Sequence, residues 1–193
     1  MQQTTRRQIC LLGGSVLPSL LCSQNVSSAT GQSDLSAVFI MVFDWMEKQF
    51  VPTAEAMPEA KFFWAPTIGA FQGVRNYAEQ IVHVSDVNAA LSEAILGRDI
   101  SKDPDLTPPP DKGATRAAVL LYMHNALVLA RKALLSIDEK NARLPLKHPL
   151  MDLMTTRLAL AMVIVAHSFN HYGQMVEYLR MNNIVPPSSR NAS

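Results

Sequence analysis

Two histidines near the end of the chain, His167 and His171, have the spacing by which a single helix offers two ring nitrogens to one metal ion. Residues four apart on a helix lie on the same face, about one turn from each other. The preceding residues, 158–166, include no glycine, proline or charged residue, which predicts a helix through this region. The pair is equally compatible with histidines that hydrogen-bond to neighbouring side chains, so a third ligand from another helix is needed to indicate a metal site.

His83 is the candidate for that third ligand, because it lies in the middle of another predicted helix. If the two helices are neighbours in a bundle, the three rings converge in its interior. Three neutral ring nitrogens at ~2.0–2.1 Å leave a divalent ion with an open position, which is typical of a reactive centre rather than a structural clamp. Zinc is the default expectation, and nickel or iron(II) also accept imidazole. The sequence therefore predicts a divalent metal site formed by His83, His167 and His171.

The roles of the other polar residues near the predicted ligands stay open. Glu79, one turn before the histidine of the second helix, either accepts the second N–H of that ring or is a solvated acid. Tyr172 and Gln174 either line the cavity or are packing and surface groups. His124 lies on or beside the apolar stripe of its helix, as a core or boundary histidine or as a spare ligand. His148, in a connecting segment, is expected at the surface.

Apolar residues recur at helical spacing in four segments, and no stretch shows the convincing alternation of a strand. Proline-containing connections, 101–112 and 138–149, separate the last three segments. We expect an all-α four-helix bundle in which the long connections permit crossovers. The predicted helices are 34–57, with a bend or an end at Pro52, about 70–96, 115–136, and from 150 or 152 to 182 or 183.

The connection between the first two predicted helices, 58–67, contains Phe62, Phe63 and Trp64. Aromatic residues in a loop usually fold back onto the core, because burial of their large rings is favourable. A surface that contacts a substrate is the alternative interpretation of the same residues.

Residues 1–29 have the three-part plan of an export signal. Arg6 and Arg7 precede an apolar run, 9–22, which is broken by two glycines and a proline, and the small residues up to Ala29 fit a cleavage site. The arginine pair resembles the twin-arginine motif, with a Sec signal and a cytosolic protein with a basic tail as the alternatives. The run is too short and interrupted for a stable membrane span. We therefore expect a protein that is exported, to the periplasm or out of the cell.

Cleavage after residue 29 would leave a single domain, 30–193, without Cys10 and Cys22 and so without a disulfide or a thiolate ligand. Loss of two arginines takes the 17 basic residues to 15 against 16 acidic ones, a formal charge of −1. A near-neutral domain with no basic cluster gives no electrostatic reason to bind nucleic acid. The remaining chain is long enough to bury a core without covalent cross-links.

Three groups of residues together carry a resemblance to a known family. The groups are Phe43-Asp44-Trp45 with Met57-Pro58-Glu59, Trp64 and Gly69-Ala70-Phe71; His83 after Tyr77-Ala78-Glu79-Gln80; and His167-x-x-x-His171-Tyr172-Gly173-Gln174 with Tyr178-Leu179-Arg180 and Pro186-Pro187. They resemble the DinB/YfiT-like superfamily of small bundle metalloproteins over nearly all of 34–187, most specifically in the C-terminal group. The resemblance implies a four-helix bundle, often dimeric, with His83, His167 and His171 in the positions of the family's metal triad. One departure is Asn182-Asn183, where a glycine commonly closes the last helix.

The resemblance and the predicted site together favour an exported metalloenzyme acting on a small molecule that the sequence does not identify. Hydrolysis and thiol transfer both fit, because a divalent ion can polarise a substrate or lower the pKa of a bound water or thiol. An export signal is unusual for the family and puts a cytosolic low-molecular-weight thiol in doubt as co-substrate. The alternatives are a non-catalytic protein that binds a metal or small ligand, and a bundle whose histidines pack in the core without metal.

Overall fold

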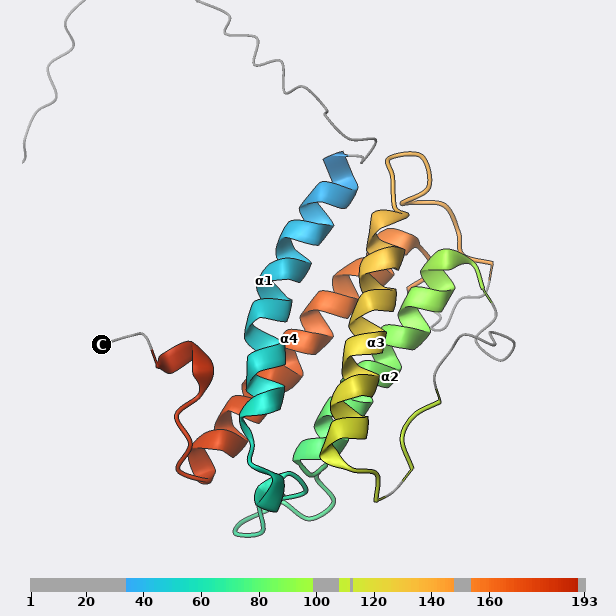
Figure 1. The fold of residues 1–193 in the computed structure, drawn as a ribbon. Helices are drawn as coiled ribbons and strands as arrows, with labels where there is room; N and C mark the ends of the chain where they lie inside the picture. Colours follow the sequence, from blue (N-terminus) through green and yellow to red (C-terminus); the bar gives the residue numbers. More distant parts are fainter. Residues whose placement is uncertain (1–33, 99–107, 112, 148–153, 191–193) are drawn as a thin grey trace, which may run out of the picture. The chain divides into compact units, whose positions relative to one another are not determined.

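Four helices form from the four segments with apolar repeats in the computed structural model, which describes residues 34–98, 108–111, 113–147 and 154–190 (Figure 1). The chain divides after residue 30 into two units, and all the described residues lie in the second. No strand occurs within the described ranges, so the all-α prediction is confirmed. The elements are α1 (Asp34–Ala56), η1 (Glu59–Lys61), α2 (Tyr77–Leu96), α3 (Arg116–Leu135), α4 (Arg157–Met181) and η3 (Pro187–Ser189), where η denotes a short 3-10 helix.

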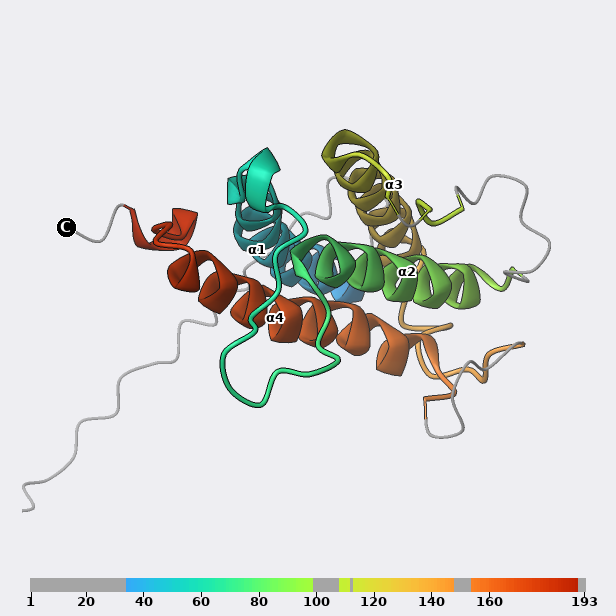
Figure 2. The ribbon, with the colours of Figure 1, turned by 90° about the horizontal axis from the view of Figure 1, so that it is seen from below.

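The helices form a bundle in which α1 and α2 each pack against both α3 and α4. The order around the bundle is therefore α1, α3, α2, α4. Figures 1 and 2 show that α1 and α4 run in one direction and that α2 and α3 run in the other. Because α2 and α3 are parallel neighbours, the connection between them must return along the length of the bundle, which is the crossover that the long connection permits.

The core lies between the helices and receives apolar side chains from all four. The connection after α1 also contributes, because Phe62 is fully buried and Trp64 packs edge-on against Tyr178 of α4 at 5.6 Å between ring centroids. The prediction that loop aromatics fold back onto the core is confirmed for these two rings. Among the largest contributors from the helices are Phe43, Phe50, Ile81, Met123, Leu127, Leu134, Leu160 and Leu179.

α2 begins at Tyr77, so the predicted start near residue 70 is wrong. The side chain of Asn76 accepts the backbone N–H of Glu79 at 2.9 Å, and the Glu79 carboxylate accepts the N–H of Asn76 at 2.8 Å. This reciprocal pair is a capping box, which satisfies two N–H groups that the first turn of a helix leaves without partners. Upstream, Gly73 has φ of +80°, a left-handed conformation that interrupts the helix although apolar residues continue through the loop.

The ends of the other helices correct the predicted start of α4 and exclude one of the two alternatives at Pro52. α4 begins at Arg157, where the hydroxyl of Thr156 accepts an N–H from the first turn, rather than at 150 or 152. Its 25 residues span ~38 Å at the usual rise of ~1.5 Å per residue. α1 continues through Pro52 and does not end there. After α4, Asn183 takes the left-handed conformation with φ of 60°, as its type and position predict.

α3 agrees with its predicted bounds, because Thr115 and Ser136 are its capping residues. Within the described part of the chain, α3 is the one helix long and apolar enough to cross a membrane, with a mean hydropathy of 1.3. Core helices of globular proteins meet the same criteria, and α3 packs against α2 and α1. Its place in the bundle therefore accounts for the buried part of its apolar surface, whereas Leu121, Val128 and Leu135 are exposed.

Candidate metal centre

The three predicted ligands converge between two neighbouring helices. His83 lies on α2, and His167 and His171 lie one turn apart on α4, which packs against α2. One ring nitrogen from each histidine lies within 4.8 Å of the other two, and the Nε2 atoms of His83 and His167 are 3.3 Å apart. The ring centroids are 4.6 to 5.0 Å from one another. The structure therefore forms a cluster of three imidazoles that can hold a metal ion.

Burial keeps this cluster neutral. His171 is buried, with 6% of its surface exposed, and His83 and His167 are half-buried. Burial, followed by the charges of the other two histidines and of Arg75, lowers the pKa of His171 to about 4. Burial is also the largest cause that lowers the pKa of His83 and of His167. At neutral pH the ring nitrogens therefore carry free lone pairs, the form in which histidine binds a metal.

Two glutamines hold His171 in place. The Nδ1–H of His171 donates a short hydrogen bond to Oε1 of Gln80, whose amide group donates to Oε1 of Gln174 at 3.2 Å. The second bond orients the Gln80 amide so that its oxygen faces the histidine, which places the proton on Nδ1 and leaves the lone pair of Nε2 free. Gln80 was not among the predicted site residues, although a residue three positions before His83 lies on the same face of α2.

Four other predictions have different outcomes. Glu79 caps the first turn of α2 through the N–H of the residue before that helix, so it is not the hydrogen-bond acceptor for a ligand ring. The hydroxyl of Tyr172 donates to a serine of η3 instead of lining the cluster. His124 is exposed, with 47% of its side-chain surface accessible, and lies 3.4 Å from a glutamate of α1, so it is not a core residue. His148 lies outside the described residues.

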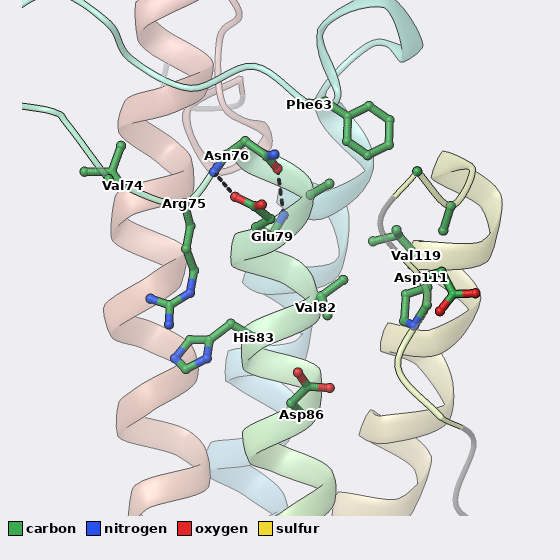
Figure 3. A pocket seen from close by; sticks show the side chains of 15 residues that line it. Phe63, Val74, Arg75, Asn76, Glu79, Val82, His83, Asp86, Asp111 and Val119 are labelled. Carbon is green, nitrogen blue, oxygen red and sulfur yellow. Dashed lines mark hydrogen bonds between the residues drawn. The ribbon is translucent and has the colours of Figure 1, made fainter.

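A pocket of about 620 Å³ adjoins the cluster and is lined by His83. Figure 3 shows that it lies over the exposed side of α2, between the loop that precedes this helix and the start of α3. Phe63, which is 48% exposed, Val82 and Val119 supply apolar surface, and Arg75 lies at the edge next to His83. A small molecule in this pocket would therefore contact one of the three imidazoles.

The comparison with known protein families supports the resemblance. The DinB superfamily matches the chain over residues 43–175, which includes most of α1, all of α2 and α3, and the part of α4 that carries both of its histidines. A comparison with curated proteins gave no match. Because the family match covers more than half of the chain, from the first helix to the last, the protein belongs to the DinB superfamily.

Proposed function

We propose that His83, His167 and His171 bind one divalent metal ion and that the protein is a metal-dependent enzyme acting on a small molecule. The observation that carries this proposal is the approach of three ring nitrogens, from two separate helices, to within 4.8 Å of one another. Zinc is the first candidate, and nickel or iron(II) would accept the same ligands.

The distances fit such an ion. Two ligand nitrogens that are each ~2.0–2.1 Å from a tetrahedral ion lie ~3.3–3.4 Å from each other. The Nε2 atoms of His83 and His167 are 3.3 Å apart. The ligand nitrogen of His171 lies within 4.8 Å of both, and a small rotation of its ring would shorten this separation.

The hydrogen bonds of the cluster also fit a shared cation. His171 donates from Nδ1 to Gln80, so its Nε2 can only accept. Nδ1 of His167 is buried without a hydrogen-bond partner among the described residues. With the protons of His83 and His167 also on Nδ1, three Nε2 lone pairs would face one another, and a cation between the rings would accept all three.

The reaction that fits best is hydrolysis or thiol transfer. A divalent ion held by three protein ligands supplies Lewis-acid polarisation, or a bound water or thiol of lowered pKa, at an open position. The chain's contribution is to hold three neutral imidazoles, to exclude water with the buried face of α4, and to offer an adjoining pocket for the substrate. The only cysteines are Cys10 and Cys22, in the proposed signal, so a reacting thiol would come from a co-substrate.

Metal analysis of the full chain without a histidine tag tests the proposal. We expect about one equivalent of metal per chain, and its loss in His167→Ala. His124→Ala is the matched control, because this exposed histidine of α3 contacts a glutamate of α1 and not the cluster. Equal metal content in the wild type and in His167→Ala would exclude the site.

Turnover separates an enzyme from a binding protein. Hydrolysis of model esters or amides, or transfer of a thiol to a model acceptor, should depend on added metal and should be lost in His167→Ala. Stoichiometric metal without any turnover would leave the alternative of a non-catalytic metal- or ligand-binding bundle.

Export of the protein is a separate proposal, supported by Arg6-Arg7, the interrupted apolar run and the small residues up to Ala29. These residues lie outside the described part of the chain. The N-terminal sequence of the protein recovered from its native host tests it. A mature chain that begins near residue 30 supports export, and a chain that retains Arg6-Arg7 contradicts it.

A further inference from the structure

Arg75 is a charged side chain that the proposed metal site leaves unused. It lies in the loop directly before α2, is exposed, and lines the pocket next to the histidine cluster. Figure 3 shows its side chain extending toward the ring of His83. Within the described ranges, no hydrogen bond or ion pair of its guanidinium group occurs. An arginine directed at a reactive cluster and lacking a carboxylate partner is available to bind an anion.

The backbone of Arg75 is held at its carbonyl oxygen and by the residue that follows it. The hydroxyl of Tyr178 on α4 donates to the carbonyl oxygen of Arg75 at 3.0 Å. The next residue, Asn76, is the N-cap of α2 and is fixed by the capping box with Glu79. The loop therefore attaches the arginine to the same two helices that carry the histidines. This attachment makes a defined position for the guanidinium group possible, because only the side chain has to be ordered when a ligand binds.

The other charges of the pocket favour an anion at Arg75 rather than elsewhere. Three carboxylates also line it, those of Glu79, Asp86 and Asp111. The Glu79 carboxylate accepts the N–H of Asn76, and the Asp86 carboxylate accepts the hydroxyl of Tyr122 at 2.6 Å. Figure 3 shows Asp86 and Asp111 on the side of α2 that faces α3, whereas the guanidinium lies on the side that faces α4. Repulsion from these two carboxylates would direct a negatively charged group toward the arginine.

The electrostatic effect of Arg75 on the three histidines agrees with its place beside the cluster. The positive charge of Arg75 is among the causes that lower the pKa of His83, His167 and His171. A cation bound at the cluster would place a further positive charge beside the guanidinium and would strengthen its attraction for an anion.

We propose that Arg75 binds an oxyanion of the substrate, a carboxylate or a phosphate, and so holds the reacting part of that molecule at the histidine cluster. This inference rests on the proposed function for the location of the reaction. The planar guanidinium of arginine presents paired N–H donors that match both kinds of oxyanion. The apolar surface from Phe63, Val82 and Val119 on the other side of the pocket suits a substrate with an aromatic or aliphatic body.

Calorimetric titration of the full chain with benzoate, phenyl phosphate and neutral benzamide tests the inference. Each probe is titrated into zinc-loaded protein and into protein freed of metal with a chelator. We expect Arg75→Gln to weaken binding of the preferred anion about tenfold in both forms, as loss of a charge-assisted hydrogen bond does. Arg75→Lys should bind with intermediate affinity, because it keeps the charge and loses the paired donors. Circular dichroism verifies that each variant is folded.

Arg143→Gln is the matched control, because it makes the same change of charge in an exposed arginine of the connection between α3 and α4, at the opposite end of the bundle from Arg75. It should bind both anions as the wild type does. Whichever of benzoate and phenyl phosphate binds more tightly identifies the oxyanion as a carboxylate or a phosphate.

The outcomes separate this inference from the metal proposal. Anion binding that depends on Arg75 in a protein without metal affinity would support the arginine site and exclude the metal site. Zinc binding together with unchanged anion affinity in Arg75→Gln would overturn the inference and leave the metal site standing. The inference is also wrong if neither anion binds the wild type, or if benzamide binds as tightly as benzoate.

Discussion

The tautomer of His171 is set by one buried amide. Gln80 is 3% exposed and accepts the Nδ1–H of the histidine, which leaves Nε2 to face the other two rings. Partners of this kind orient a ligand ring and raise its basicity, and their loss typically lowers metal affinity by about 10- to 100-fold. We therefore expect Gln80→Leu to weaken zinc binding by this amount in competition with a chelating dye.

Two further variants test this explanation. Gln80→Glu keeps an acceptor for the Nδ1–H and should retain zinc affinity. Gln49→Leu makes the same change on α1, where the glutamine contacts Tyr172 and not the cluster, and should bind zinc as the wild type does. Equal losses in Gln80→Leu and Gln49→Leu would indicate a general effect on the fold.

The lowered pKa of His171 predicts how the stability of the metal-free protein changes with pH. The pKa is about 4 in the folded chain against 6.5 for an ordinary histidine, so between these values the unfolded state binds more protons. The free energy of unfolding should therefore be highest above pH ~6.5, fall as the pH decreases toward ~4, and lose up to about 3 kcal/mol.

Urea unfolding at several pH values measures this dependence. The free energy of unfolding of His171→Gln should decrease less over the same pH interval, because this variant lacks the histidine whose pKa is lowered most among the three. A wild-type free energy of unfolding that rises as the pH falls from 6.5 to 4 would contradict the prediction.

At the scale of a single element, the start of α2 positions both Arg75 and His83. The capping box of Asn76 and Glu79 sets the residue at which the helix begins. Removal of a capping side chain typically costs about 1 kcal/mol. We expect Asn76→Ala to lower the free energy of unfolding by this amount and also to weaken the binding of anionic probes, because it loosens the segment that carries the arginine.

Thr115→Ala removes the corresponding cap of α3 and is the control. This variant should lower the free energy of unfolding by a similar amount, measured by thermal unfolding, and should leave anion binding unchanged. If both variants weaken anion binding equally, the effect comes from overall stability and not from the position of Arg75.

At the scale of the whole molecule, a metal bound to the three histidines would join α2 to α4. A ligand that binds only the folded state at 100 times its Kd stabilises that state by about 2.7 kcal/mol. For a domain of this size we expect zinc to raise the Tm by about 5–10 °C. His167→Ala should lose this increase, and His124→Ala should keep it. A Tm increase of equal size in both variants would mean that zinc binds elsewhere.

The oligomeric state is the other property of the whole molecule. The homodimer that the family resemblance implies stays a prediction, and analytical ultracentrifugation of the untagged chain tests it.

The pattern of apolar residues by itself determined the fold class and the order of the helices along the chain. α3 was predicted to within one residue at each end, because apolar residues and capping side chains agree there. The start of α2 was missed, although Asn76 and Glu79 have the spacing of a capping box, because the apolar pattern continues through the loop before it. The start of α4 was missed in the same way, since a helical pattern does not reveal which residue caps it.

His167 and His171 could be paired from the sequence alone, because residues four apart on one helix are neighbours whatever surrounds them. The contact of His83 with His167 and that of Gln80 with His171 join residues 84 and 91 positions apart. Only the tertiary structure decided these contacts, together with the direction of Arg75. The physical reason is that contacts between helices depend on which helices are neighbours and on their rotation about their axes, and no local spacing in the chain specifies either.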